Sequence, residues 1–169
     1  MIQLYTFNDN WRLLYNREKH MVSAALKGYK ISSIEHIGAT SVVLCNTSGT
    51  IDVLVSIPSI LDLFTIKNAL SKVSGYECVE HKSNNHLLFF VRRNERKQIV
   101  ATIRIVEYAS AEYNKVLSFK YYLKQRNSNV IRYNQFRQAL AEHYQNDYRG
   151  YQKAKESYIQ SILEEYCKY

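Results

Sequence analysis

Apolar and polar positions follow two different spacings along this chain, one before about residue 108 and one after it. Short runs rich in β-branched residues predict strands at 29–37, 50–57, 76–80, 86–93 and 98–108. Helical spacing predicts a first helix from a cap at Asn8 or Asp9 to about Lys27, and a second over 59–73, after the only proline. Three more helices are expected at about 110–126, 129–145 and 148–168.

This order of elements predicts an α+β fold. We expect a mixed sheet over about 29–108, flanked by helices, and a helical C-terminal segment over about 110–168. A length of 169 residues suits one domain with its own core, so 1–169 is taken as a single domain. Hydrophobic residues make up 46% of the chain, which argues against disorder.

Charge gives a weaker indication of function. The net charge of +8 is consistent with an anionic partner such as a nucleotide or nucleic acid. The alternative is that the lysines and arginines lie scattered over solvated helix faces. The only tight basic cluster, within 92–97, lies between two predicted strands and suggests a hairpin loop. We therefore expect a nucleotide or other phosphorylated small molecule, with nucleic acid left as a further alternative that only the net charge supports.

Cysteine content and hydropathy bound the compartment. Cys45, Cys78 and Cys167 are too few and too widely spaced for a disulfide framework or a zinc site. No apolar run reaches the roughly 18 residues of a membrane span, and the first residues lack the apolar core of a signal peptide. We expect a cytoplasmic protein without a membrane partner.

The segment 35–55 carries the candidate chemistry. Gly38 ends a predicted strand, and Ala39, Thr40 and Ser41 follow it. Glycine allows a tight turn and close approach to a ligand, while the two hydroxyls can cap a helix or contact a phosphate. An ordinary strand-to-helix turn is the alternative.

Two titratable residues flank this turn. Asp52 alternates with Ile51 and Val53 in a β-rich run, so it faces away from the core and needs a metal, an ion-pair partner or solvent. A metal and a salt bridge are left as equal alternatives. His36 can position a phosphate or act as an acid–base group, or it is simply hydrogen-bonded in place.

These residues resemble the motifs of the GrpB family, a group with a nucleotidyltransferase-like fold. Its E-H-I-G-S-T-S-V motif is matched by 35–42, and its I-D-I segment by 51–53. Trp11, the pair Gly75-Tyr76 and the segment 119–124 match further family positions. The resemblance implies Mg²⁺ or Mn²⁺ at Asp52 and transfer of a nucleotidyl group from an NTP to an unknown acceptor.

Several family or superfamily positions are substituted. The serine of the G-S turn is Ala39, the position that would share the face of Asp52 is Leu54, and the family's H-L-H segment is 102–104, Thr-Ile-Arg. One acid cannot hold two metal ions in the way that two-metal phosphoryl transfer requires. The alternative function is a catalytically degenerate member that binds an anionic ligand or a protein.

The same set of residues is expected to form the site in either function. Catalysis is assigned to Asp52 and His36, with Asp52 also the metal ligand. Phosphate or nucleotide binding is assigned to Gly38, Ala39, Thr40, Ser41, Arg104, Lys120 and Lys124.

Overall fold

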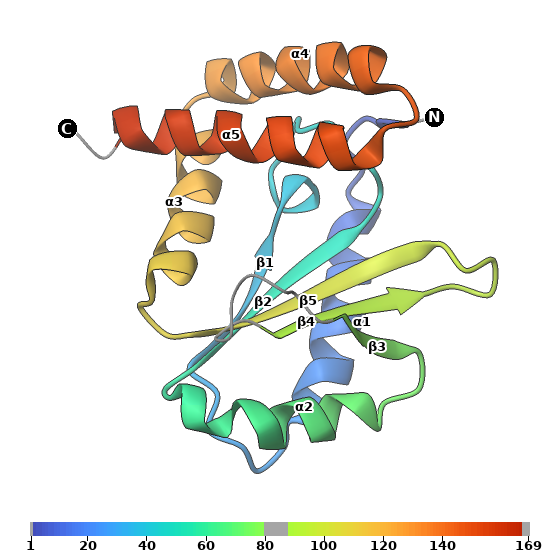
Figure 1. Cartoon of the computed structure of the whole chain (residues 1–169), viewed down its shortest axis with the longest axis vertical. Coiled ribbons are helices and arrows are strands. Elements are labelled where there is room, and N and C mark those ends of the chain that lie inside the picture. The colour runs from blue at the N-terminus through green and yellow to red at the C-terminus, as the bar shows by residue number, and fades with distance from the viewer. Residues whose placement is uncertain (1, 80–87, 167–169) are drawn as a thin grey trace.

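The computed structural model of the chain describes residues 2–79 and 88–166. A five-stranded sheet lies at its centre (Figure 1). The strands are β1 (Ser33–Ile37), β2 (Ile51–Ile57), β3 (Tyr76–Val79), β4 (Leu88–Arg93) and β5 (Ile99–Glu107). The helices are α1 (Asn10–Ala25), α2 (Leu63–Ser71), α3 (Ala111–Gln125), α4 (Asn127–Tyr144) and α5 (Tyr148–Tyr166), with short 3₁₀ turns η1 (Ala39–Ser41) and η2 (Ile60–Asp62).

The sheet is mixed. Its strand order is β1-β2-β5-β4-β3, and β2 pairs with β5 in parallel while the other neighbours are antiparallel. The parallel pair places Asp52 opposite Thr102 and Leu54 opposite Arg104. The candidate acid therefore lies near the start of β2, beside the strand that carries the expected arginine.

One face of the sheet packs against α1 and α2. Tyr15 and Val22 of α1 and Ile66 of α2 belong to the main apolar core, together with Val53 and Ile103 of the central strands. Each aliphatic side chain fully buried there stabilises the fold by about 1.5–3 kcal/mol. This face holds no open surface at its centre.

The other face is covered only in part. Leu117 of α3 packs on Leu54 and Val106. Helices α4 and α5 lie side by side in a separate layer above the sheet, and α3 leads up to them (Figure 1). A second apolar cluster, including Cys45 and Tyr133, joins this helical layer to the loop after η1.

The structure confirms the predicted α+β class and most of the predicted elements. Strand β1 begins at Ser33, not at residue 29, because Gly28 adopts a φ of +93° and a turn follows it. The helix expected over 59–73 is split into η2 and α2, and the Ser59 hydroxyl caps η2 by accepting from the Leu61 amide. Strands β4 and β5 form the expected hairpin; residues 80–87 of the predicted strands lie outside the described residues. Within the described residues, no helix combines the length and the apolar character needed to span a bilayer.

Candidate functional site

Strand β2 divides its side chains between the two faces of the sheet. Ile51, Val53 and Val55 lie in the main core, as their alternation predicts. Asp52 and Leu54 therefore point to the other face, where Leu54 is fully buried. The position that could place a second acid beside Asp52 carries an apolar side chain.

The turn after β1 lies against the carboxylate of Asp52. Gly38 has a φ of +71°, and a Cβ atom there would lie 2.2 Å from Asp52 Oδ2, so only glycine fits. Asp52 Oδ1 accepts a hydrogen bond from the Thr102 hydroxyl at 2.6 Å. Burial raises the pKa of Asp52, while the Thr102 bond and nearby positive charges act in the opposite direction. The carboxylate is thus enclosed on two sides by backbone and hydroxyl.

Three basic side chains from three elements act on this carboxylate. They are Lys155 of α5, Arg104 of β5 and Arg137 of α4, and Lys155 has the strongest effect. Burial, together with the charge of Arg137, lowers the pKa of Lys155 to about 8, although Asp52 opposes this shift. Positive charge exceeds negative charge around Asp52.

Arg137 is held rigidly within the helical layer. Only 5% of its surface is exposed. Its Nε donates to the Tyr151 hydroxyl at 3.0 Å, its Nη1 donates to the Asn46 carbonyl, and its guanidinium lies 5.5 Å from the centre of the Tyr133 ring. These contacts fix the direction of a charge that would otherwise be expensive to bury.

Arg104 is paired on one side only. Its Nη1 donates to the Glu112 carboxylate at 2.7 Å. Its Nε is enclosed and has no hydrogen-bond partner among the described residues. The guanidinium therefore has an unsatisfied enclosed donor, on the face of the sheet that Asp52 occupies.

His36 lies on the opposite face, which packs against α1. Its ring stacks on Tyr15 with centroids 4.3 Å apart, and its Nε2 lies 2.9 Å from the Thr40 hydroxyl. That hydroxyl donates to the Thr50 carbonyl, so we assign the hydrogen to Nε2 of His36. Burial lowers the pKa of His36 to about 4, which keeps the ring neutral at neutral pH. The geometry favours support of the turn by His36 over an acid–base role beside Asp52.

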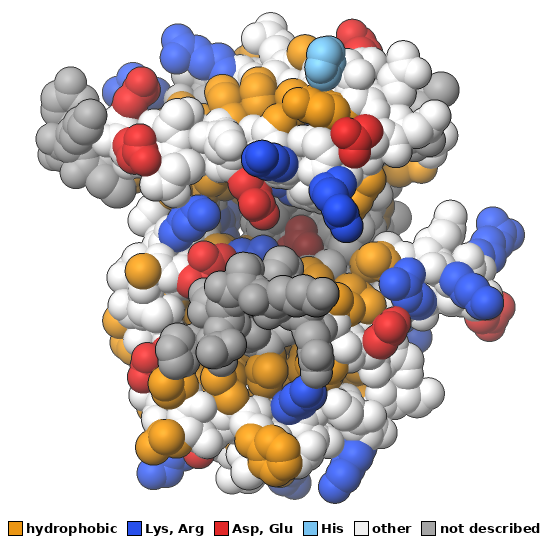
Figure 2. Space-filling view, viewed as in Figure 1, with side chains coloured by type: hydrophobic (Ala, Val, Ile, Leu, Met, Phe, Trp, Pro, Cys, Tyr) orange, Lys and Arg blue, Asp and Glu red, His pale blue; other side chains and the backbone are white. Residues whose placement is uncertain are grey.

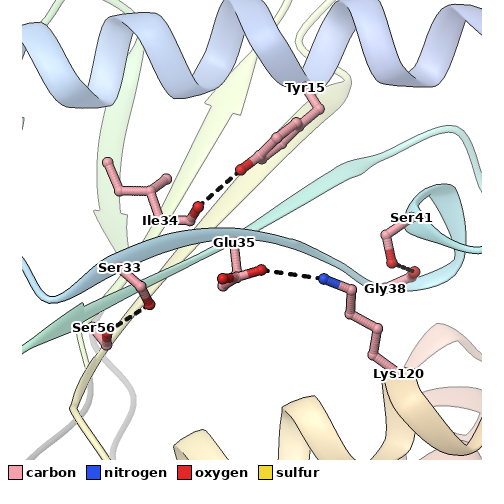
Figure 3. A network of polar contacts seen from close by, with 8 residues as sticks. All are labelled: Tyr15, Ser33, Ile34, Glu35, Gly38, Ser41, Ser56 and Lys120. Carbon is pink, nitrogen blue, oxygen red and sulfur yellow. Dashed lines mark hydrogen bonds and ion pairs between the residues drawn. The ribbon is translucent and has the colours of Figure 1, made fainter.

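The turn itself uses most of its own polar groups. The Ser41 hydroxyl donates to the Gly38 carbonyl at 2.7 Å, and the Ser41 amide donates to the same oxygen at 3.1 Å (Figure 3). Thr40 is buried, and Ala39 packs against the second apolar cluster. The segment 38–41 thus brings its backbone close to Asp52, while its two hydroxyl groups are already hydrogen-bonded within the protein.

Lys120 and Lys124 lie on α3 beside β1. Lys120 Nζ donates to Glu35 at 3.3 Å, and Figure 3 shows it reaching β1 from the side opposite Tyr15. Glu35 pairs with Leu54 in register and so shares the face of Asp52. Burial and the charge of Lys120 lower the pKa of Lys124, which indicates two neighbouring ammonium groups one helical turn apart.

Figure 2 shows a recess across the middle of this side of the molecule, between the helical layer and the sheet, with basic and acidic side chains close to it. The basic groups that act on Asp52 come from distant parts of the sequence. The sheet contributes Arg104, and the helices contribute Lys155 and Arg137.

The residues present do not fit a pair of divalent metal ions. Among residues 2–79 and 88–166, no three His, Cys, Asp or Glu side chains are placed to hold a metal. Leu54 stands beside Asp52, and Thr102 and Arg104 occupy the facing positions of β5. A cation-rich setting repels a metal ion as strongly as it attracts an anion.

Sequence reasoning did not assign Lys155 and Arg137 to the site. A signal was present for Lys155, because it follows Tyr151 by one turn and precedes Ile159 by one turn on the buried stripe of α5. A lysine inside an apolar stripe needs an anionic partner or an opening. The identity of that partner depends on the tertiary fold.

The comparisons with solved structures support the fold. A conserved GrpB protein from Enterococcus faecalis superposes with a TM-score of 0.83 at 21% identity, over 96% of both chains. The GLD-2/RNP-8 complex matches with a TM-score of 0.56 at 13% identity, over 83% of this chain and 55% of the other. Cid1, described by its RNA terminal uridylyl transferase activity, matches with a TM-score of 0.54 at 11% identity, over 81% and 42% of the two chains. These likenesses show a nucleotidyltransferase-like fold.

The sequence comparisons cover nearly the whole chain. The glutamate-rich protein GrpB of Alkalihalophilus pseudofirmus is 26% identical over 164 residues, which span 96% of this chain and 94% of the relative. The profile of the family described as GrpB protein matches residues 1–165. The Gly38 turn and Asp52 lie within this match, and the chain belongs to the GrpB family.

Proposed function

We propose that this protein binds the phosphate groups of a nucleotide, or of another phosphorylated small molecule, in the recess beside Asp52. The observation that carries the proposal is that three basic side chains from three different elements, Lys155, Arg104 and Arg137, act on the Asp52 carboxylate. Guanidinium and ammonium groups directed at one point are the usual partners of phosphate oxygens.

The surrounding residues suit the same class of ligand. Gly38 brings backbone close to the site without a side chain. At the α3 side, burial and the charge of Lys120 lower the pKa of Lys124, and an anion beside Lys124 would oppose this shift. A ligand with more than one phosphate group could contact both the Lys155 side and the α3 side.

Nucleotidyl transfer is the second candidate, favoured by the retained Asp52 beneath its glycine turn. In that reaction an acceptor oxygen would attack the α-phosphorus of an NTP and pyrophosphate would leave. The single carboxylate makes this candidate weaker than binding alone. Release of labelled pyrophosphate from an NTP with Mn²⁺, lost in Asp52→Asn, would support it.

The test of the binding proposal is a thermal-shift screen. Nucleoside mono-, di- and triphosphates, pyrophosphate and sugar phosphates are added to the wild-type protein, each with and without Mg²⁺. A ligand present at about 100 times its Kd stabilises the folded state by about 2.7 kcal/mol, which gives a clear upward shift in Tm. Nucleosides without phosphate are the control. If no phosphorylated compound raises Tm under any condition, the proposal is wrong.

A further inference from the structure

Lys155 is the basic residue with the strongest effect on Asp52, and the sequence alone assigned it no role in the site. Lys155 lies on the inward stripe of α5, where Tyr151 and Leu163 are 3% and 6% exposed. The Tyr151 hydroxyl accepts from Arg137, so the turn of α5 that precedes Lys155 is tied to α4. Lys155 is therefore presented toward the sheet by a fixed part of the helical layer.

The ammonium group of Lys155 is held near Asp52 without direct pairing. It is the strongest positive influence on that carboxylate, yet within the described residues it forms no hydrogen bond and no ion pair within 4.0 Å. Two side-chain polar atoms of the described residues are fully enclosed and have no hydrogen-bond partner, Trp11 Nε1 and Arg104 Nε. Lys155 Nζ is not one of them. A group in the recess can therefore reach it.

The positions around Asp52 that would supply further metal ligands carry side chains that cannot bind a divalent ion. Leu54 and Thr102 flank Asp52, and Arg104 lies opposite Leu54 on β5. A divalent ion placed here would meet three cations besides the carboxylate of Asp52, and among the residues described only Arg104 of the three is paired with a carboxylate, that of Glu112. Phosphate would meet the same cations favourably.

We infer that Lys155 supplies beside Asp52 the positive charge that divalent metal ions supply in carboxylate-rich sites, so that this protein binds phosphate groups without a metal. The inference rests on the proposed function and identifies Lys155 as the main cation that binds the phosphate. Lys155 donates to the phosphate, while the Asp52 carboxylate stays bonded to the Thr102 hydroxyl and does not contact the ligand. The expected ligand is a phosphate ester or anhydride that is not complexed with Mg²⁺.

The experiment measures the affinity of the full chain for ATP and for pyrophosphate by calorimetry, in EDTA and in Mg²⁺. Lys155→Met removes the charge and keeps the length of the side chain, and Lys155→Arg keeps the charge. Lys153→Met is the matched control, because Lys153 is exposed on the same helix. Circular dichroism checks that each variant is folded, and Lys155→Arg keeps the test informative should Lys155→Met fail to fold.

The inference predicts binding in EDTA, a loss of about tenfold or more in Lys155→Met, equal to about 1.4 kcal/mol, and little change in Lys155→Arg and Lys153→Met. Binding that requires Mg²⁺, or binding in EDTA that Lys155→Met and Lys155→Arg leave unchanged, would overturn the inference while the proposed function stands. Absence of binding in wild type under both conditions would overturn the proposed function as well.

Discussion

The contact between the Gly38 turn and Asp52 allows a sharp test of the site geometry. Gly38→Ala adds one methyl group, whose carbon would lie 2.2 Å from Asp52 Oδ2 and 3.0 Å from its Cγ. The substitution also places a side chain at a φ of +71°. Two separate costs are expected, and another glycine of the chain separates them.

The first cost is the backbone conformation, about 1–2 kcal/mol for an L-residue in the left-handed region. The second is displacement of the Asp52 carboxylate, which breaks its 2.6 Å bond to Thr102. A hydrogen bond to a charged group contributes about 1.5–3 kcal/mol. Gly38→Ala should therefore lower the free energy of unfolding by roughly 2.5–5 kcal/mol.

Gly28→Ala is the matched control. Gly28 has a φ of +93°, and a Cβ there would meet nothing within 4 Å. Gly28→Ala should therefore lower the free energy of unfolding only by the cost of the backbone conformation, about 1–2 kcal/mol. In an Asp52→Ala background, the loss caused by Gly38→Ala should fall toward the same value, because the two closest atoms, Asp52 Oδ2 and Cγ, are gone and only Cβ at 3.1 Å remains.

Urea denaturation followed by circular dichroism gives the free energy of unfolding of each variant, provided that the m-values agree. The reasoning predicts that Gly38→Ala loses more stability than Gly28→Ala by about 1.5–3 kcal/mol. Equal losses for the two variants, within about 0.5 kcal/mol, would show that the turn does not lie against the carboxylate.

Three further results are expected. The pKa of Lys155, which lies near Asp52, Arg104, Arg137 and Glu156, is about 8 in the folded protein and 10.5 in the unfolded chain. Between these two pH values the unfolded chain binds more protons, so the stability of the free protein should rise with pH. ATP affinity should fall over the same range, because the lysine loses its charge. Urea denaturation and calorimetry across this range check both trends, and an equal loss of affinity in Lys155→Arg would contradict this assignment. Arg137→Met should lower the free energy of unfolding by roughly 2–4 kcal/mol, because the Tyr151 hydroxyl of α5 and the Asn46 carbonyl of the loop before β2 lose a buried donor. Thermal denaturation measures this, and a loss below about 0.5 kcal/mol would contradict it. Truncating Tyr158 to alanine should cost a few kcal/mol by the same assay, since its ring stacks on a neighbour with centroids 3.7 Å apart, and an unchanged Tm would place that face in solvent.

Local patterns were enough to predict most of the fold. Alternation along 51–57 correctly separated Asp52 from the core residues Ile51 and Val53, because a strand has only two faces. Helical spacing located the three C-terminal helices within a few residues of their observed bounds. The start of β1 was wrong because propensity alone cannot show where pairing with β2 begins.

The site was harder to predict, because its charges come from elements far apart in the chain. His36 is close to Gly38 in sequence, yet the pleat places it on the face opposite Asp52. Lys155 is more than a hundred residues from Asp52 and reaches it only through the packing of α5. The family resemblance predicts carboxylate chemistry at Asp52, whereas the structure shows which basic groups surround that residue.

The most direct test of the account is calorimetric titration of ATP, in EDTA, into wild type and Asp52→Asn. A metal-binding role for Asp52 predicts that neither protein binds ATP in EDTA, because the metal that would link ATP to the carboxylate has been removed. A metal-free phosphate site predicts that both proteins bind and that the variant binds at least as tightly, since a negative charge has been removed from beside the phosphate. Loss of binding in Asp52→Asn, or no binding by wild type without Mg²⁺, would contradict the account.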